Sequence, residues 1–117
     1  MENHLNTKNS KEVYQLRIYE LFEKNETEFY ERMREYVVRI MKKYEFNILG
    51  TWKSKFNGRI EFVYLLKWPD EKTMTAQWKK FMADQEWNQI KDQTTIKYGN
   101  MVGDIENRVL SVAYPGH

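Results

Sequence analysis

The sequence predicts a single α+β domain, in which a four-stranded antiparallel sheet carries helices on one face. Three observations favour this fold class. β-branched and aromatic residues gather in four short runs, apolar residues recur at helical spacing between two pairs of these runs, and an Asn-Gly pair separates the second run from the third. The length of 117 residues is typical of one domain and is enough to bury a core without disulfides.

The first predicted strand covers residues 13–21, where Val, Ile, Leu and Tyr alternate partly with polar side chains. A helix follows, with Asn25 as its N-cap and Glu28 placed to close a capping box. Apolar side chains then recur at helical spacing from Phe29 to Tyr44, and acidic residues open the segment while basic residues close it. This stretch is the clearest helix in the sequence.

A hairpin is predicted after this helix. Its strands cover 48–53 and 59–68, and Asn57-Gly58 between them is the dipeptide that a tight two-residue turn favours. Pro69 ends the second strand, because proline cannot donate a hydrogen bond to the sheet.

Two aspartates are predicted to start further helices. Asp70 precedes a helix whose inward face carries Met74, Trp78, Phe81 and Met82. Asp84 precedes a short helix with Trp87 and Ile90 turned inward, and a last strand covers 104–113. The order of strand, helix, strand, strand, helix and strand is that of the ferredoxin-like split βαβ fold. Residues 1–11 are polar, so we expect a disordered N-terminal tail before a domain that covers 12–117.

Composition and charge exclude several classes of protein. The 19 basic and 17 acidic residues are mixed along the chain, so no basic stripe points to a nucleic-acid partner. The sequence contains no cysteine, which excludes disulfides and thiolate metal sites. No apolar run approaches the roughly 18 residues of a membrane span, so membrane insertion is not expected. The first residues lack the pattern of a secretory signal, which predicts a cytoplasmic protein.

Alternation along 59–68 separates two sets of side chains. One set has aliphatic residues at its centre and charged ends (Glu61, Val63, Leu65 and Lys67), and we expect it to pack under the helices. The other set is apolar or aromatic throughout (Ile60, Phe62, Tyr64, Leu66 and Trp68), and would face away from the helices. No loop is long enough to cover such a face, so a second copy related by a two-fold axis is predicted to bury it. The fold would then be a dimeric α/β barrel with a cavity between the two sheets.

The other strands are assigned in the same way. Leu16 and Ile18 are expected to face the helices, while Gln15, Arg17 and Tyr19 face the cavity. Trp52 is placed in the cavity with Ile48 and Gly50 on its side of the strand. The last strand is ambiguous, and we favour Glu106 and Arg108 near the cavity or the dimer seam.

Several short motifs resemble the NIPSNAP family, a branch of the dimeric α/β-barrel superfamily. The resemblance covers about 13–114, and its motifs are Leu16-Arg17-Ile18-Tyr19, Gly50-Thr51-Trp52, Ala83-Asp84-Gln85-Glu86-Trp87 and Ile105-Glu106-Asn107-Arg108-Val109-Leu110. It implies a homodimeric barrel and a biochemistry that is mostly uncharacterised; some eukaryotic members are associated with mitochondria or vesicle traffic. The superfamily includes small oxygenases, haem-degrading enzymes and isomerases. The chain departs from the family at Tyr64 and Leu66, in a segment where members often carry a histidine, so a role that needs that histidine is not carried over.

The candidate ligand-binding residues are Arg17, Tyr19, Trp52, Tyr64, Trp68 and Glu106. An arginine that faces a cavity must be paired or hydrogen-bonded. Arg17 is therefore predicted either to bind a carboxylate or enolate of a ligand, or to form a structural ion pair with Glu106 or with another carboxylate at the dimer seam. Neither His4 nor His117 lies within a predicted strand or helix, and no carboxylates share a convincing interior position. We therefore expect no metal and no cofactor, and we assign no catalytic residue.

Two hypotheses about function remain open. The first is a protein that binds a small aromatic or carbonyl compound in the barrel cavity; if it is an enzyme, it would be a cofactor-independent oxygenase or isomerase. The second is a non-catalytic dimeric module for protein interaction.

Overall fold

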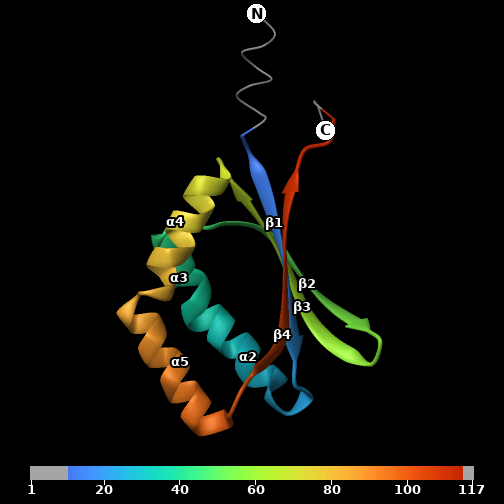
Figure 1. Cartoon of the computed structure of the whole chain (residues 1–117). Coiled ribbons are helices and arrows are strands. Elements are labelled where there is room, and N and C mark those ends of the chain that lie inside the picture. The colour runs from blue at the N-terminus through green and yellow to red at the C-terminus, as the bar shows by residue number, and fades with distance from the viewer. Residues whose placement is uncertain (1–10, 115–117) are drawn as a thin grey trace, which may run out of the picture.

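The structure is a computed structural model that describes residues 11–114. Four antiparallel strands form one sheet in the order β2-β3-β1-β4, and the helices lie together on one of its faces (Figure 1). The strands are β1 (Val13–Leu21), β2 (Asn47–Phe56), β3 (Arg59–Trp68) and β4 (Val102–Ser111). The predicted α+β fold with a four-stranded antiparallel sheet is confirmed. The predicted disordered tail falls, apart from Lys11, outside the described residues.

The helix predicted between the first two strands is continuous from Glu26 to Lys43. It consists of α2 (Glu26–Arg32), a π-helical stretch η2 (Met33–Val37) and α3 (Val38–Lys43), and the short 3-10 turn η1 (Glu23–Asn25) precedes it. The predicted capping box is absent. Instead, the Asn25 amide donates to the backbone carbonyls of Tyr98 and Asn100 at 3.1 and 3.0 Å, which fastens the start of this helix to the end of α5.

The two aspartate caps form as predicted. The Asp70 carboxylate accepts from the Thr73 backbone N–H at 2.6 Å and starts α4 (Glu71–Met82). Asp84 starts α5 (Gln85–Tyr98) in the same way, and α5 is longer than the short helix that the sequence predicts. Asn57 and Gly58 form the hairpin turn with φ values of 52° and 75°, a conformation that asparagine and glycine tolerate best.

The predicted orientation of the sheet is wrong. Tyr64, Leu66 and Trp68 are at most 1 % exposed and lie in the core under the helices. Val63 and Leu65 alternate with them and are only half-buried on the opposite face. Both sets contain apolar residues at the centre, so alternation separates them but does not say which set meets the helices. The larger aromatic set buries more apolar area there, which explains the observed choice.

The pairing of β1 with β3 shows that the predicted orientation of β1 is wrong as well. Arg17 lies opposite Tyr64 and therefore shares the helix-covered face, whereas Leu16 lies opposite Leu65 on the other face. Leu16 and Ile18 thus belong to the face without helices, contrary to the prediction. We call this face the open face; its central side chains come from three strands and are Leu16, Ile18, Trp52, Val63 and Leu65.

A bulge in β2 separates Ile48 from Trp52. The register shifts between Ile48 and Gly50, so Ile48 lies opposite Leu66 and packs on the core while Trp52 lies opposite Val63 on the open face. The Trp52 ring covers Gly50 so closely that a Cβ there would lie 2.8 Å from the indole. The predicted sharing of a face by Gly50 and Trp52 is confirmed, and the addition of Ile48 to it is wrong because of the bulge.

Candidate functional site

A cavity of about 220 Å³ lies between the helix-covered face of the sheet and the helices. Cavities for drug-sized ligands are roughly 300–1,000 Å³, so this one suits a molecule of about one ring. Side chains from β1, β4 and the helices line this cavity. They are Arg17, Tyr19, Phe29, Arg32, Met33, Val37, Met41, Trp78, Phe81, Met82, Trp87, Lys91, Val102 and Ile105. Three of these side chains are cationic and none is acidic.

Arg17 is the charged group of β1 that lines the cavity, and its partners are neutral. Its guanidinium donates to the Tyr19 hydroxyl at 3.1 Å, and more weakly to the Tyr64 hydroxyl and to the Asn107 side-chain oxygen, each at 3.4 Å. It also lies over the Trp78 ring, 4.4 Å from the centroid. Among residues 11–114, no carboxylate comes within 4.0 Å of it. A half-buried cation without an anionic partner can therefore accept one from a ligand.

A second set of hydrogen bonds holds the neighbours of Arg17 in place. The Gln15 side-chain oxygen accepts from the indole N–H of Trp68 at 2.9 Å and from that of Trp78 at 2.7 Å. The Gln15 amide in turn donates to the Asn107 oxygen at 2.7 Å. These bonds fix the orientation of Trp78 and Asn107, which are the two groups that flank the guanidinium.

Tyr19 and Tyr64 form a hydroxyl pair beside Arg17, with 2.5 Å between their oxygens. Burial, the nearby Tyr19 oxygen and its hydrogen bond together raise the pKa of Tyr64 well above its ordinary value, against the opposing effect of Arg17. Tyr64 is fully buried, so it acts as the support behind Tyr19 and has no access to the cavity. Tyr19 is the hydroxyl that a ligand would meet.

The opposite wall of the cavity contains a second arginine. Arg32 lies with its guanidinium carbon 5.1 Å from the centre of the Trp87 ring and donates to the Thr94 hydroxyl of α5 at 2.8 Å. Its Nε is buried and has no hydrogen-bond partner. Burial lowers the pKa of Arg32, partly offset by Tyr19. The π-helical stretch contributes Met33 and Val37 to the same wall, and such stretches occur frequently at functional sites.

The structure brings together only some of the predicted ligand-binding residues. Arg17, Tyr19 and Tyr64 form one cluster, although under the helices and not on the open face. Trp68 packs behind them in the core and does not line the cavity. Trp52 lies on the open face and is 54 % exposed.

Glu106 also lies away from Arg17. It sits on the open face opposite Ile18 and pairs with Arg108 of its own strand. The predicted alternative in which Arg17 pairs with Glu106 is therefore wrong. The reason is the register of β4. It places Asn107 beside Arg17, so Glu106 and Arg108, which flank Asn107 in the strand, point to the other face of the sheet.

Sequence reasoning did not select Arg32 or Lys91 as site residues. Both lie on helices whose inward faces were assigned from apolar residues alone. A signal was available for Arg32, because it directly precedes the inward-facing Met33 and follows the inward-facing Phe29 by three positions. A basic residue at such a position can reach the edge of the core.

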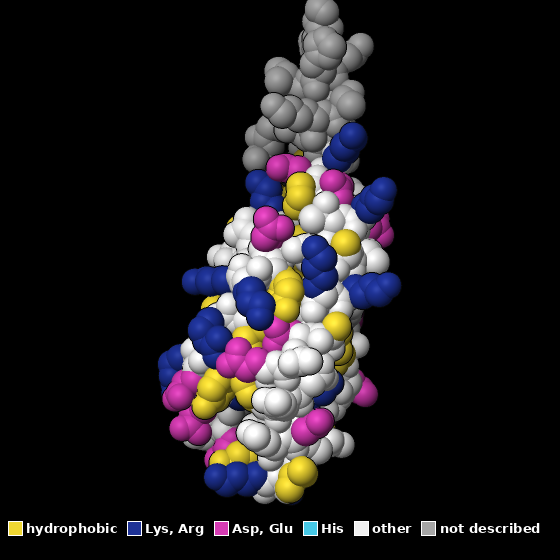
Figure 2. Space-filling view, turned by 90° about the vertical axis from the view of Figure 1, so that its left-hand side faces the viewer, with side chains coloured by type: hydrophobic (Ala, Val, Ile, Leu, Met, Phe, Trp, Pro, Cys, Tyr) yellow, Lys and Arg dark blue, Asp and Glu magenta, His cyan; other side chains and the backbone are white. Residues whose placement is uncertain are grey.

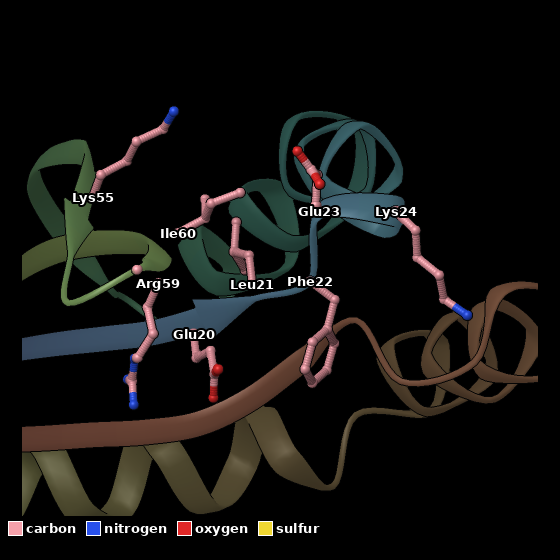
Figure 3. Close-up of a pocket in the computed structure, with 9 residues that line it drawn as sticks. Glu20, Leu21, Phe22, Glu23, Lys24, Lys55, Arg59 and Ile60 are labelled. Atoms are coloured by element: carbon pink, nitrogen blue, oxygen red, sulfur yellow. The ribbon is translucent and has the colours of Figure 1, made fainter.

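Larger depressions exist on the surface, but their polar groups either point apart or already pair with one another. One of about 470 Å³ lies beside the β2–β3 turn, and Figure 3 shows the ends of Lys55, Glu23 and Lys24 pointing in different directions around it. Another of about 430 Å³ lies over the open face. Ligand sites have a few polar groups aimed at one point, which favours the smaller cavity.

Other classes of site find no support in the part of the chain that the structure describes. No three potential metal ligands come together in residues 11–114. On the helical side, basic and acidic side chains are interspersed (Figure 2). No helix within the described range is long and apolar enough to cross a membrane. The cytoplasmic location stays a prediction.

Comparison with known families assigns the chain. The model of the NIPSNAP family matches residues 14–114, which is nearly the whole of the described domain. The chain belongs to the NIPSNAP family. No curated protein matches it. The resemblance stated from the sequence motifs is confirmed.

Solved structures of NIPSNAP proteins have the same fold. An uncharacterised NIPSNAP-like domain protein from Burkholderia xenovorans is 15 % identical, with a TM-score of 0.75 over 92 % of this chain and 90 % of that one. A NIPSNAP family protein of unknown function from Agrobacterium tumefaciens is 17 % identical, with a TM-score of 0.74 over 92 % and 93 % of the two chains. A putative antibiotic biosynthesis monooxygenase from Bacteroides thetaiotaomicron is more distant, at 18 % identity and a TM-score of 0.59 over 92 % and 94 %. At these identities the likeness concerns the fold alone.

Proposed function

We propose that this NIPSNAP protein binds a small aromatic or carbonyl compound in the cavity between its sheet and its helices. The observation that carries the proposal is Arg17, a half-buried cation that lines the cavity and has only neutral partners. Its guanidinium and the Tyr19 hydroxyl would donate to an oxygen of the ligand. Aromatic rings of Phe29, Trp78, Phe81 and Trp87 would contact the body of the ligand.

The open face supports a second part of the proposal, which is a homodimer formed by two sheets. Its centre is apolar and includes Trp52, which is 54 % exposed, and Phe56 further along the same strand is 61 % exposed. Rigid aromatic rings at this exposure are typical of interface residues. A second copy of the same chain fits best, because a face with apolar residues at its centre is self-complementary under a two-fold axis.

The alternative function is a non-catalytic dimeric module whose surface serves protein interaction. The exposed rings of Trp52 and Phe56 favour it, because they are also suited to contact with a different protein. The two functions differ in what they require of the cavity. An interaction module needs no cation there, so a ligand would bind without regard to Arg17.

Substitution of Arg17 tests the binding proposal. Cinnamamide is a suitable probe, because it is neutral, has one ring and offers a carbonyl oxygen. Calorimetric titration should show saturable binding that Arg17→Met weakens by about tenfold or more, since a hydrogen bond to a charged group contributes roughly 1.5–3 kcal/mol. The control is Arg108→Met, which removes an arginine from the open face of the neighbouring strand and should leave the affinity unchanged. Absence of saturable binding, or equal loss in both variants, would contradict the proposal.

A further inference from the structure

We infer that the ligand of the cavity carries a carboxylate, and that Arg32 and Lys91 bind this group beside Trp87. The inference rests on the proposed function and adds the charge of the ligand and the end of the cavity that recognises it. It concerns the wall formed by the helices, whereas Arg17 and Tyr19 belong to the sheet.

The first observation is that Arg32 forms no ion pair with the nearby glutamate of its own helix, Glu28. Glu28 lies one turn earlier, at the spacing that favours ion pairs on a helix. Glu31 and Glu35 lie beside a neighbouring depression that Arg32 also borders. None of these carboxylates comes within 4.0 Å of the guanidinium. The side chain points across to α5 instead, where it reaches Thr94 and Trp87.

The second observation is that a buried donor of Arg32 has no acceptor. The Nη1 atom donates to Thr94, but the buried Nε has no acceptor. A buried donor without a partner costs roughly 1–3 kcal/mol, so the chain alone does not satisfy the guanidinium of Arg32, and an acceptor supplied by a ligand would stabilise it. The planar fork of arginine matches the two oxygens of a carboxylate better than it matches a single carbonyl.

The third observation is a surplus of positive charge around one indole. The Lys91 ammonium lies 6.0 Å from the centre of the same Trp87 ring, so two cations lie close to one side chain. Lys91 also lines the cavity, and no acidic residue does. Two like charges repel one another, and an anion between them removes that repulsion. The cavity would therefore hold an acid more tightly than a neutral molecule of the same shape.

Cinnamate and cinnamamide form the matched pair for the test, because they differ chiefly in charge. Each offers one polar group, so we expect the amide oxygen of cinnamamide at Arg17 and Tyr19 and the carboxylate of cinnamate at Arg32 and Lys91. At pH 7 we expect the protein to bind cinnamate about tenfold more tightly than cinnamamide, as charge-assisted hydrogen bonds are about twice as strong as neutral ones. Arg32→Gln should bring this ratio close to one, because it weakens the binding of cinnamate by about tenfold. Lys91→Gln should also lower the ratio, which gives a second variant should the first fail to fold.

Arg34→Gln is the matched control. Arg34 lies two positions further along the same helical segment, is exposed, and should leave the ratio unchanged. A ratio near one in the unmodified protein, with cinnamamide still bound, would overturn this inference and leave the proposed function standing. Loss of the ratio in Arg17→Met but not in Arg32→Gln would overturn it too, since the carboxylate would then lie at the sheet. Saturable binding of neither probe would overturn both proposals.

Discussion

At the scale of single residues, Arg17 is the centre of the candidate site. Three neutral acceptors and two aromatic rings, those of Tyr19 and Trp78, offset the cost of burying its charge. Each acceptor also has a partner of its own. The two tyrosine hydroxyls bond to one another, and the Asn107 oxygen accepts from Gln15. The guanidinium is thus held in place by groups that do not depend on it.

This arrangement predicts how Arg17→Met affects stability. The substitution leaves no carboxylate unpaired and no hydroxyl without a partner, and the methionine can pack on Trp78. We expect the free energy of unfolding in urea to stay within about 1 kcal/mol of the unmodified protein. A loss of about 3–5 kcal/mol, the cost of breaking a buried ion pair, would show that Arg17 is a structural residue.

Residue patterns predicted the members of this cluster but not its place. Alternation along β1 correctly grouped Gln15, Arg17 and Tyr19, because side chains two apart must share a face. It could not orient the sheet, since both faces of β3 have apolar centres. Which face meets the helices depends on the total area that all elements bury together, and that is a property of the packed fold.

At the scale of elements, Asp84 connects the end of one helix to the start of another. Its carboxylate caps α5 and accepts from the Lys43 ammonium at 2.9 Å and the Tyr44 hydroxyl at 2.6 Å, both at the end of α3. The side chain is only 2 % exposed. The hydrogen bond from Tyr44, followed by those from the Trp87 backbone and Lys43, lowers the pKa of Asp84 to about 2 against the opposing effect of burial.

A pKa of Asp84 below its usual value makes stability depend on acid pH. The ionised carboxylate stabilises the fold above its unfolded pKa of 3.8, and this contribution is lost as the pH falls from about 4 to about 2. It amounts to about 2 kcal/mol. Urea denaturation at a series of pH values should therefore show a shallower loss of stability for Asp84→Asn than for the unmodified protein. Asp92→Asn, an exposed position on α5, should keep the original slope, and an equally steep slope in Asp84→Asn would contradict the assignment.

Features of the helices and strands were predicted correctly where the bonds that cause them join residues close in sequence. They were predicted less well where the bonds join distant residues. Asp70 and Asp84 cap their own helices through bonds over three residues, so the sequence contains the whole cause. Asn25 is the opposite example, because its side-chain amide donates hydrogen bonds to backbone carbonyls more than 70 residues away in the sequence. The bulge after Ile48 is similar, since the register against β3 becomes visible only once the two strands are paired.

At the scale of the whole molecule, the helices within residues 11–114 all lie on one side of the sheet (Figure 1). The candidate site lies within one chain, between these layers, and the open face is the surface that we propose for a second copy. This differs from the sequence-based prediction, in which the same face formed both the dimer contact and the cavity. The proposed binding and the proposed dimerisation can therefore be disturbed separately.

Val63→Asp tests the dimer. Val63 lies at the centre of the open face, opposite Ile18 and Trp52, so a charge there would be buried without a partner in the dimer. Analytical ultracentrifugation should give about twice 14.4 kDa for the unmodified protein and about 14.4 kDa for the variant. Ile96→Asp, at a position of α5 that is 86 % exposed, should stay dimeric. A soluble monomer from the unmodified chain at micromolar concentration would contradict the dimer.

The four tryptophans report directly on where a ligand binds. Trp78 and Trp87 line the cavity, Trp68 is buried behind it, and Trp52 lies on the open face. Each indole N–H gives its own signal in a proton–nitrogen NMR spectrum, so a titration with cinnamamide places the ligand without any substitution. We predict saturable shifts of the Trp78 and Trp87 signals and no shift at Trp52. Shifts at Trp52 with Trp78 and Trp87 unchanged would place the ligand on the open face and contradict a binding site between the sheet and the helices.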